Sequence, residues 1–320
     1  MPVEFRVVRE PSRDLLAQIS AMTPENPFYT SAYVNSLRLS GVTPFALILE
    51  SGNHLLSACT AFLRTGRLNT TLEITSLPSL PAKSIFWTGL VEFCRASDIS
   101  ILEINTFGST ETSIEALDGE TSRKGRYEFQ LDLAGTDLWI GLNRRNRRSI
   151  KKAMEAGLRL KLAEESQACQ IHVNIANSSL NRSRKRGEAI GYEIEADDAR
   201  RFIENKAGEI YQAKLDDEVL SSILILRSET GAYAQTSGTI DAGLEYGSSQ
   251  FLWYETALRL QNESLTVLNM GGTDKASLGL QEFKAGFGAK RIELESAEFY
   301  LGGFARKMTG TLIERLRSRK

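Results

Sequence analysis

The spacing of apolar residues changes repeatedly along the first third of the chain. Alternation with a period of two is typical of strands with one buried face, and a spacing of three to four residues is typical of amphipathic helices. Gly52-Asn53 separates two alternating runs and predicts a hairpin. The pattern predicts strands over residues 3–8, 45–50, 55–63, 72–75 and 101–105, and helices over residues 11–19, 30–39 and 83–96.

The remainder of the chain repeats this mixture of helices and strands. Residues 109–126 are polar and predict a loop, and Ala-Gly-Thr at 134–136 predicts a domain boundary. We therefore expect a mixed α/β protein with two domains, residues 1–135 and 136–320, each with its own core. The later predicted strands are 127–133, 159–163, 210–215, 219–226, 232–239, 265–268 and 292–300, and the later predicted helices are 137–156, 167–186, 197–205, 248–260 and 304–317.

The segment 265–288 is the most informative part of the sequence. It begins as a buried strand that the glycine pair 271–272 is expected to end, and Asp274 is then placed to cap a short helix. That helix carries Lys284 directly after Phe283. In open α/β sheets, ligands bind beyond the carboxyl ends of strands. An ammonium group there, close to aromatic rings, would stabilise an oxyanion or a phosphate, and a solvent-facing lysine on an amphipathic helix is the other interpretation.

Composition and charge narrow the possible partners. The chain is 42% hydrophobic and 25% charged, with a net charge of −1, so any phosphate recognition needs a local basic patch. Cys59, Cys94 and Cys169 are far apart and lack metal-ligand spacing, which indicates reduced thiols, and we expect no metal site. The charged N-terminus and the lack of a long apolar run predict a cytoplasmic protein without membrane insertion.

Two basic clusters could supply such a patch. The first cluster lies within residues 144–152, in a predicted helix. Residues four apart share a helix face, so this cluster places like charges together, at a cost of about 0.2–0.5 kcal/mol per pair. A polyphosphate or RNA-backbone site and a solvated helix face both fit this pattern. The first cluster contains Arg144, Arg145, Arg147, Arg148, Lys151 and Lys152, and the second contains Arg182, Arg184, Lys185 and Arg186.

Several motifs together resemble a known enzyme family. The run Phe-Lys-Ala-Gly-Phe-Gly at 283–288 follows a strand, a Gly-rich turn and a helix, and precedes a further predicted strand. This order resembles the closing signature of the FemABX aminoacyltransferases and of the related BcsL/CelD-type acetyltransferases. The basic helix, the turn and helix at 247–260 and the N-terminal NPFYTSAYVNSL are also similar, so the resemblance covers most of the chain. It implies tandem GNAT-like domains and direct attack of an amine on an activated acyl group.

The resemblance also implies roles for individual residues. Lys284 would be the catalytic residue that stabilises the developing charge, and Tyr233 and Gln235 would lie on one strand face, toward the substrate groove. One position departs from the family, because Asn269 stands where an acidic residue usually ends the strand. The implied substrate contacts are Arg186, Tyr233, Gln235, Asp274 and Phe283.

Two donors are compatible with the sequence, aminoacyl-tRNA and acyl-CoA, and no bound cofactor is expected. CoA-dependent GNAT proteins normally carry Arg/Gln-x-x-Gly-x-Gly/Ala where this chain has Leu-Glu-Tyr-Gly-Ser-Ser at 244–249, which favours aminoacyl-tRNA. The acceptor would be a cell-wall precursor, a peptide or a peptidyl natural product. A GNAT-fold binding protein without catalysis is a third interpretation, which Asn269 supports. The candidate donor contacts are Arg144, Arg147, Arg148 and Lys151, together with Gly247, Ser248 and Ser249, whose backbone N–H groups could hold an anion or simply form a capped turn.

Overall fold

The computed structural model describes residues 1–135, 137–165, 167–187 and 193–302. Its contacts divide the chain into two units, and neither unit is continuous in sequence. Unit 1 comprises Met1–Thr23, Leu37–Arg126 and the chain from Glu293, and unit 2 comprises Pro24–Ser36 and Tyr127–Ile292. The predicted boundary after residue 135 differs from this division, because the last described strand returns to pair within unit 1.

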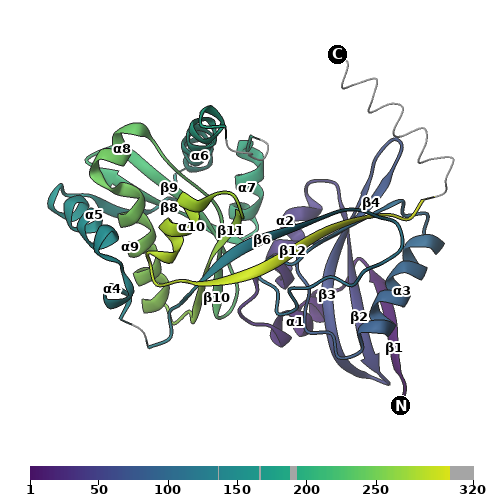
Figure 1. Cartoon of the computed structure of the whole chain (residues 1–320). Helices are drawn as coiled ribbons and strands as arrows, with labels where there is room; N and C mark the ends of the chain where they lie inside the picture. The colour runs from purple at the N-terminus through teal and green to yellow at the C-terminus, as the bar shows by residue number, and fades with distance from the viewer. Residues whose placement is uncertain (136, 166, 188–192, 303–320) are drawn as a thin grey trace. The chain divides into compact units, whose positions relative to one another are not determined.

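Unit 1 is a mixed sheet packed against helices (Figure 1). Its elements are β1 (Val3–Arg9), α1 (Arg13–Met22), β2 (Thr43–Ser51), β3 (His54–Thr65), β4 (Thr70–Ile74), α3 (Lys83–Ala96), β5 (Ile101–Asn105) and parts of β6 (Glu120–Asp132) and β12 (Lys290–Tyr300). The strand order is β1-β2-β3-β4-β5-β12-β6. Along this order from β1 to β12, the β4–β5 pair is parallel and the other pairs are antiparallel. Helix α3 connects β4 to β5.

Unit 2 repeats this plan. Its elements are η1 (Pro27–Tyr29), most of α2 (Ser31–Arg38), the rest of β6 and β12, α4 (Leu138–Gly141), α5 (Arg144–Glu155), β7 (Arg159–Leu162), α6 (Ala168–Lys185), α7 (Ala196–Glu204), β8 (Gly208–Leu215), β9 (Glu218–Arg227), β10 (Gly231–Thr239), α8 (Asp241–Tyr246), α9 (Ser248–Asn262), β11 (Val267–Asp274) and α10 (Leu278–Ala285). The strand order is β6-β11-β10-β9-β8-β7. Here β10 and β11 are parallel and are joined through α8 and α9, which confirms the mixed α/β class and the repeated order of elements.

Helices cover both faces of the unit 2 sheet (Figure 1). On β9, the Ser221 hydroxyl donates to the carbonyl of Ser248 in α9 at 3.0 Å. The next residue, Ser222, lies 2.9 Å from a ring nitrogen of His172 in α6. Successive residues of a strand point to opposite faces, so α9 packs on one face of the sheet and α6 on the other.

The first half of β6 has a polar sequence and was not predicted as a strand. Residues 120–126 were expected in a loop, yet they form the first half of the strand. Polar contacts with β12 stabilise them: the Thr121 hydroxyl donates to Glu298 Oε1 at 2.6 Å, and Arg123 bonds Glu295 at 2.7 Å. Contacts with a strand distant in sequence therefore stabilise this part of β6, and the local hydrophobic pattern cannot predict such contacts.

Two further boundaries differ from prediction. The glycine pair 271–272 does not end β11, which continues to Asp274. The helix expected over 137–156 is split into α4 and α5, because Asn143 accepts a hydrogen bond from the Asn146 N–H at 2.8 Å and caps a new helix. The helix expected over 304–317 lies outside the described residues. Within the part of the chain that is described, no helix has both the length and the apolar content needed to cross a membrane.

Candidate active site

Lys284 is buried in unit 2, with 4% of the residue exposed. It lies in the last turn of α10, and its Nζ donates to the carbonyl oxygens of Gly271 at 2.7 Å and Gly272 at 3.0 Å. Both carbonyls belong to β11, beyond Asn269, which is the last residue of that strand to pair with β10. The ammonium group is therefore held where the pairing of two parallel strands ends, the position at which α/β sheets commonly bind ligands.

The end of α10 packs onto the start of the basic helix α5. The Asn143 N–H donates to the Gly286 carbonyl at 2.9 Å. A Cβ at Gly286 would come within 2.5 Å of Asn143 Nδ2 and 2.8 Å of Asn146 Nδ2, so a larger residue would displace these two amides. Gly286 thus lies where the end of α10, which carries Lys284, contacts the start of α5, which carries the first basic cluster.

A buried carboxylate lies on the neighbouring strand β6. Glu128 is 0% exposed, and its two oxygens accept hydrogen bonds from the Tyr233 hydroxyl and the Asn269 amide, each at 2.8 Å. The Asn269 side-chain oxygen accepts from the Gly271 N–H at 2.9 Å. The Gly271 carbonyl accepts from Lys284, so hydrogen bonds connect Tyr233, Glu128 and Asn269 to Lys284 through the backbone of Gly271.

The two residues predicted to share a face of β10 do not do so. Tyr233 is buried, and its ring meets that of Phe28 at a centroid distance of 4.8 Å. Gln235 is exposed at an irregularity between Ala234 and Thr236, where the pairing with β9 gains an extra residue. A β-bulge of this kind interrupts the alternation on which the prediction relied.

Two other predicted substrate residues have local roles. The Phe283 ring is half-buried, 5.2 Å from the ring of Phe287 and 6.4 Å from that of Trp253, and it packs against the core. Asp274 ends β11 and accepts from the Ala276 N–H at 2.8 Å, so it caps the turn and not α10.

The first basic cluster is exposed along α5. Arg144, Arg148 and Lys151 face solvent, and Lys151 lies 6.0 Å from the centre of the Trp139 ring. Arg147 differs, because its guanidinium donates to the carbonyls of Leu142 at 2.9 Å and Ile140 at 3.1 Å and so holds the α4–α5 connection. Arg186, at the end of α6, is exposed and donates to the Ser183 hydroxyl at 3.0 Å.

The turn before α9 is closely packed. Gly247 has a φ of +71°, and a Cβ there would lie 2.7 Å from the Ser149 carbonyl of α5. The Ser248 side chain is buried and Ser249 is half-buried. Arg182 of α6 bonds Asp241, the first residue of α8, at 3.0 Å. The Gly247 backbone and the Ser248 side chain are therefore packed within the protein.

Comparison with known proteins agrees with this architecture. A family model described as an acetyltransferase (GNAT) domain matches residues 142–285. The chain carries a GNAT acetyltransferase domain. Its enzyme class is acyltransferase. No curated protein matches the chain in sequence.

Solved structures share the fold over most of the chain. The crystal structure of FemX has a TM-score of 0.67 at 10% identity, with 91% of this chain and 96% of that chain covered. A tandem GNAT protein from the clavulanic acid biosynthesis pathway has a TM-score of 0.57 at 14% identity, with 94% and 99% covered. L-PGS from Bacillus licheniformis has a TM-score of 0.55 at 12% identity, with 96% and 97% covered. The two units therefore form a tandem GNAT-like fold.

Unit 2 contains an acid that sequence reasoning missed. Glu128 alternates with Tyr127 and Phe129 in an apolar–polar pattern that predicts a solvent-facing carboxylate. In the structure both Glu128 and Phe129 are buried, because β6 lies inside the sheet between β12 and β11. The one indication in the sequence was Asn269, which stands on β11 where the resembling family usually has an acid. A carboxylate from a neighbouring strand could take that place, and Glu128 of β6 accepts a hydrogen bond from Asn269.

We expect Gly271→Ala to destabilise the GNAT domain by about 2–4 kcal/mol. Gly271 has a φ of +78°, and an added Cβ would lie 2.8 Å from the Ala234 carbonyl, so backbone strain and overpacking combine. Gly279→Ala in α10 is the matched control, because a Cβ there meets no atom within 4 Å and should stabilise the helix by up to about 1 kcal/mol. Urea unfolding of both variants measures the difference, and equal stabilities would contradict the tight fit at Gly271.

His172 should make the stability of unit 2 depend on pH. Burial lowers the pKa of its imidazole from 6.5 to about 4, and its ring nitrogens meet the hydroxyls of Ser222 at 2.9 Å and Thr236 at 2.8 Å. As the pH falls below 6.5 the unfolded chain takes up this proton first, so stability falls until the pH nears 4, by about 3 kcal/mol in total. Urea unfolding between pH 7 and pH 4.5 should show a shallower loss in His172→Gln than in the wild type. Parallel curves would contradict this.

Among the described residues, no group of three or more histidine, cysteine, aspartate or glutamate side chains gathers where it could hold a metal ion.

Proposed function

We propose that this acyltransferase acts in the cytoplasm and moves an aminoacyl group from aminoacyl-tRNA to the amine of a cell-wall precursor, a peptide or a peptidyl natural product. The observation that carries this proposal is the junction of α5 with α10. Asn143 precedes the exposed Arg144 and bonds Gly286, two residues after Lys284. A polyanion bound along α5 would therefore end close to the buried ammonium group.

The proposed reaction is a direct displacement at the ester carbonyl. The acceptor nitrogen forms a bond to the carbonyl carbon and loses a proton, and the ester bond to the ribose oxygen breaks as that oxygen gains a proton. Negative charge develops on the carbonyl oxygen during the attack, and the Lys284 ammonium would stabilise it. Glu128 would act as a positioning residue, because its contacts orient Tyr233 and, through Asn269, the glycine carbonyl that holds Lys284.

An acyl-CoA donor is the second candidate, because the matching family model describes acetyltransferases. The turn before α9 argues against it. Gly247 is backed by Ser149, the Ser248 side chain is buried, and an acid, Asp241, opens α8. A pyrophosphate group needs accessible N–H groups and positive charge at such a turn.

The donor can be tested by binding. We expect charged tRNA to bind with an affinity that falls steeply with salt, and the double variant Arg144→Glu/Arg148→Glu to reduce the salt slope by about 2. Arg147 is left intact, since it supports the α4–α5 connection. Arg9→Glu/Arg67→Glu, an equal charge change at exposed positions of unit 1, is the control and should leave tRNA binding unchanged.

Product formation completes the test. Charged tRNA and candidate amines should give an amide product, and CoA should cause no thermal stabilisation. Stabilisation by micromolar CoA would replace aminoacyl-tRNA by acyl-CoA as the donor. Tight binding of charged tRNA without any turnover across acceptor amines would favour the non-catalytic interpretation.

A further inference from the structure

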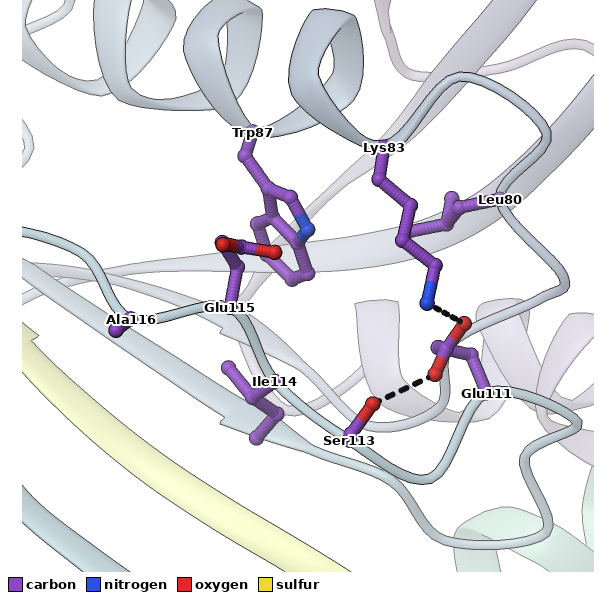
Figure 2. Close-up of a pocket in the computed structure, with 8 residues that line it drawn as sticks. All are labelled: Leu80, Lys83, Trp87, Glu111, Ser113, Ile114, Glu115 and Ala116. Carbon is purple, nitrogen blue, oxygen red and sulfur yellow. Dashed lines mark hydrogen bonds and ion pairs between the residues drawn. The ribbon is translucent and has the colours of Figure 1, made fainter.

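Unit 1 contains a cavity of about 160 Å³, and none of the residues that line it belongs to the candidate active site. It opens between the start of α3 and the segment 111–116, and Figure 2 shows polar side chains from both sides turned toward it. Lys83 and Trp87 come from α3, where a spacing of four residues places them on one helix face. Glu111 and Glu115 come from the facing segment.

The two carboxylates that line the cavity, those of Glu111 and Glu115, differ in their partners. Lys83 Nζ pairs with Glu111 Oε2 at 2.7 Å, and the Ser113 hydroxyl donates to Glu111 Oε1 at 2.8 Å. Burial raises the pKa of the Glu111 carboxyl, but these two partners outweigh it and hold that pKa below its usual value. Within the described residues, the Glu115 carboxylate makes no hydrogen bond or ion pair. The lining thus carries one positive and two negative charges.

An aromatic ring completes the lining. Trp87 is 4% exposed and is fixed in the core by an edge-to-face contact with Phe86 at 5.1 Å. The ring lines the same cavity as the Glu115 carboxylate. Indole is the side chain that best attracts a cation to its face, and a carboxylate adds charge and hydrogen-bond acceptors.

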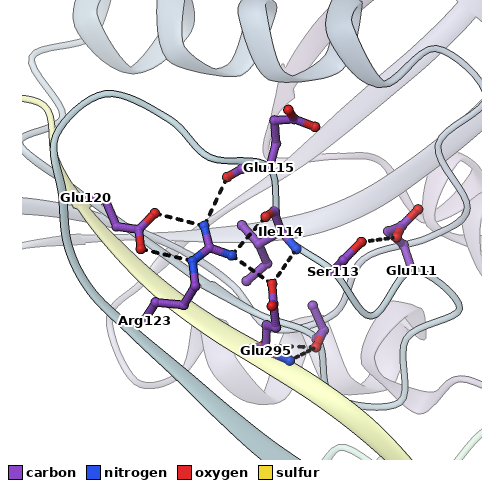
Figure 3. Close-up of polar contacts among 8 residues, drawn as sticks. Glu111, Ser113, Ile114, Glu115, Glu120, Arg123 and Glu295 are labelled. Atoms are coloured by element: carbon purple, nitrogen blue, oxygen red, sulfur yellow. Dashed lines mark hydrogen bonds and ion pairs between the residues drawn. The ribbon is translucent and has the colours of Figure 1, made fainter.

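The segment that carries Glu115 is held in place before any ligand binds (Figure 3). Arg123 on β6 donates to the carbonyls of Ile114 at 2.9 Å and Glu115 at 3.3 Å. Its guanidinium also bonds Glu120 at 2.8 Å and Glu295 at 2.7 Å, and Glu295 accepts from the Ile114 N–H at 2.9 Å. This clamp fixes the backbone of the segment that carries Glu115, so little backbone freedom would be lost there on binding.

We propose that this cavity binds a small organic cation that bears a primary ammonium group. The excess carboxylate sets the charge of the ligand, the indole accepts its alkyl chain and cation, and the N–H donors of a primary amine match the oxygens of Glu115. An anion would meet the Glu115 charge and would have to displace Glu111 from Lys83. The site is separate from acyl transfer and would persist in a variant that lacks Lys284.

The test uses the intact protein labelled with ¹⁵N in its three tryptophans, each of which gives one indole signal. We expect n-butylamine, at constant ionic strength, to move the Trp87 signal saturably and to leave Trp139 and Trp253 of unit 2 unchanged. N-acetylbutylamine and butyrate should move none of them. Single Trp→Phe variants assign the signals.

Glu115→Gln should weaken n-butylamine binding at least fivefold. Asp118→Asn is the matched control, since it removes an exposed carboxylate from the same loop without touching the cavity, and its binding should equal that of the wild type. The proposal would be overturned by the absence of a saturable shift at millimolar n-butylamine, by a stronger response to butyrate, or by equal affinities of Glu115→Gln and the wild type.

Discussion

Lys284→Met should lower the turnover of amide formation at least about 100-fold in a protein that remains folded. Methionine keeps most of the volume of the side chain but removes the charge that would meet the developing oxyanion, and losing one such group commonly costs 10²–10³ in rate. The effect should appear in kcat and not in KM, because the charge is needed in the transition state. The carbonyls of Gly271 and Gly272 lose a donor, so we also expect about 1–3 kcal/mol of destabilisation.

Steady-state kinetics with charged tRNA, together with thermal unfolding, measure both effects. Lys290→Met is the control, because Lys290 is exposed at the start of β12 and should tolerate the change in rate and stability. A folded Lys284→Met enzyme with turnover within a few-fold of the wild type would show that the lysine only braces β11.

Glu128→Ala should reduce the free energy of unfolding by about 3–5 kcal/mol. It leaves the Tyr233 hydroxyl and the Asn269 amide buried without their acceptor, and it empties a site that is 0% exposed. Glu128→Gln should recover most of this stability, to within about 1–2 kcal/mol of the wild type, because an amide can still bond both neighbours. Its turnover should nevertheless fall at least tenfold, since the amide NH₂ must donate to one neighbour and so reverses one hydrogen bond.

Urea unfolding and turnover of the two variants separate these roles. Glu282→Ala serves as the control, because that carboxylate is exposed on α10 and should change neither quantity. If Glu128→Ala were as stable as the wild type, the hydrogen-bonded chain from Tyr233 to Lys284 would not support the site. Full activity in Glu128→Gln would show that the orientation of those hydrogen bonds is unimportant.

Local pattern predicted much of the fold. The bounds of α3 and β5 match the predicted ranges, because amphipathic spacing and short apolar runs specify such elements by themselves. Ile85, an apolar residue of that helix, is nevertheless 37% exposed. The first half of β6 and the glycine-rich end of β11 depend on partners distant in sequence, which no local pattern reports.

The candidate site was predictable in one part. The position of Lys284 after a buried strand and the family signature drew attention to it, and the structure places it beside β11, where it is buried. Local pattern did not identify Glu128, because its burial depends on where β6 lies in the sheet order. Arg147 and Phe283 show the opposite case, in which a residue type suited to ligand binding is used for packing and backbone contacts.

The return of β12 to unit 1 has a consequence for synthesis of the protein. Thr106, just after β5, and Glu295 of β12 bond each other across 189 residues of sequence. At about 5–20 residues per second, a ribosome needs roughly 10–40 s to translate that interval. The edge of β5 that β12 later covers is bare throughout, so the nascent chain should depend on chaperones during this wait more than its length alone would suggest.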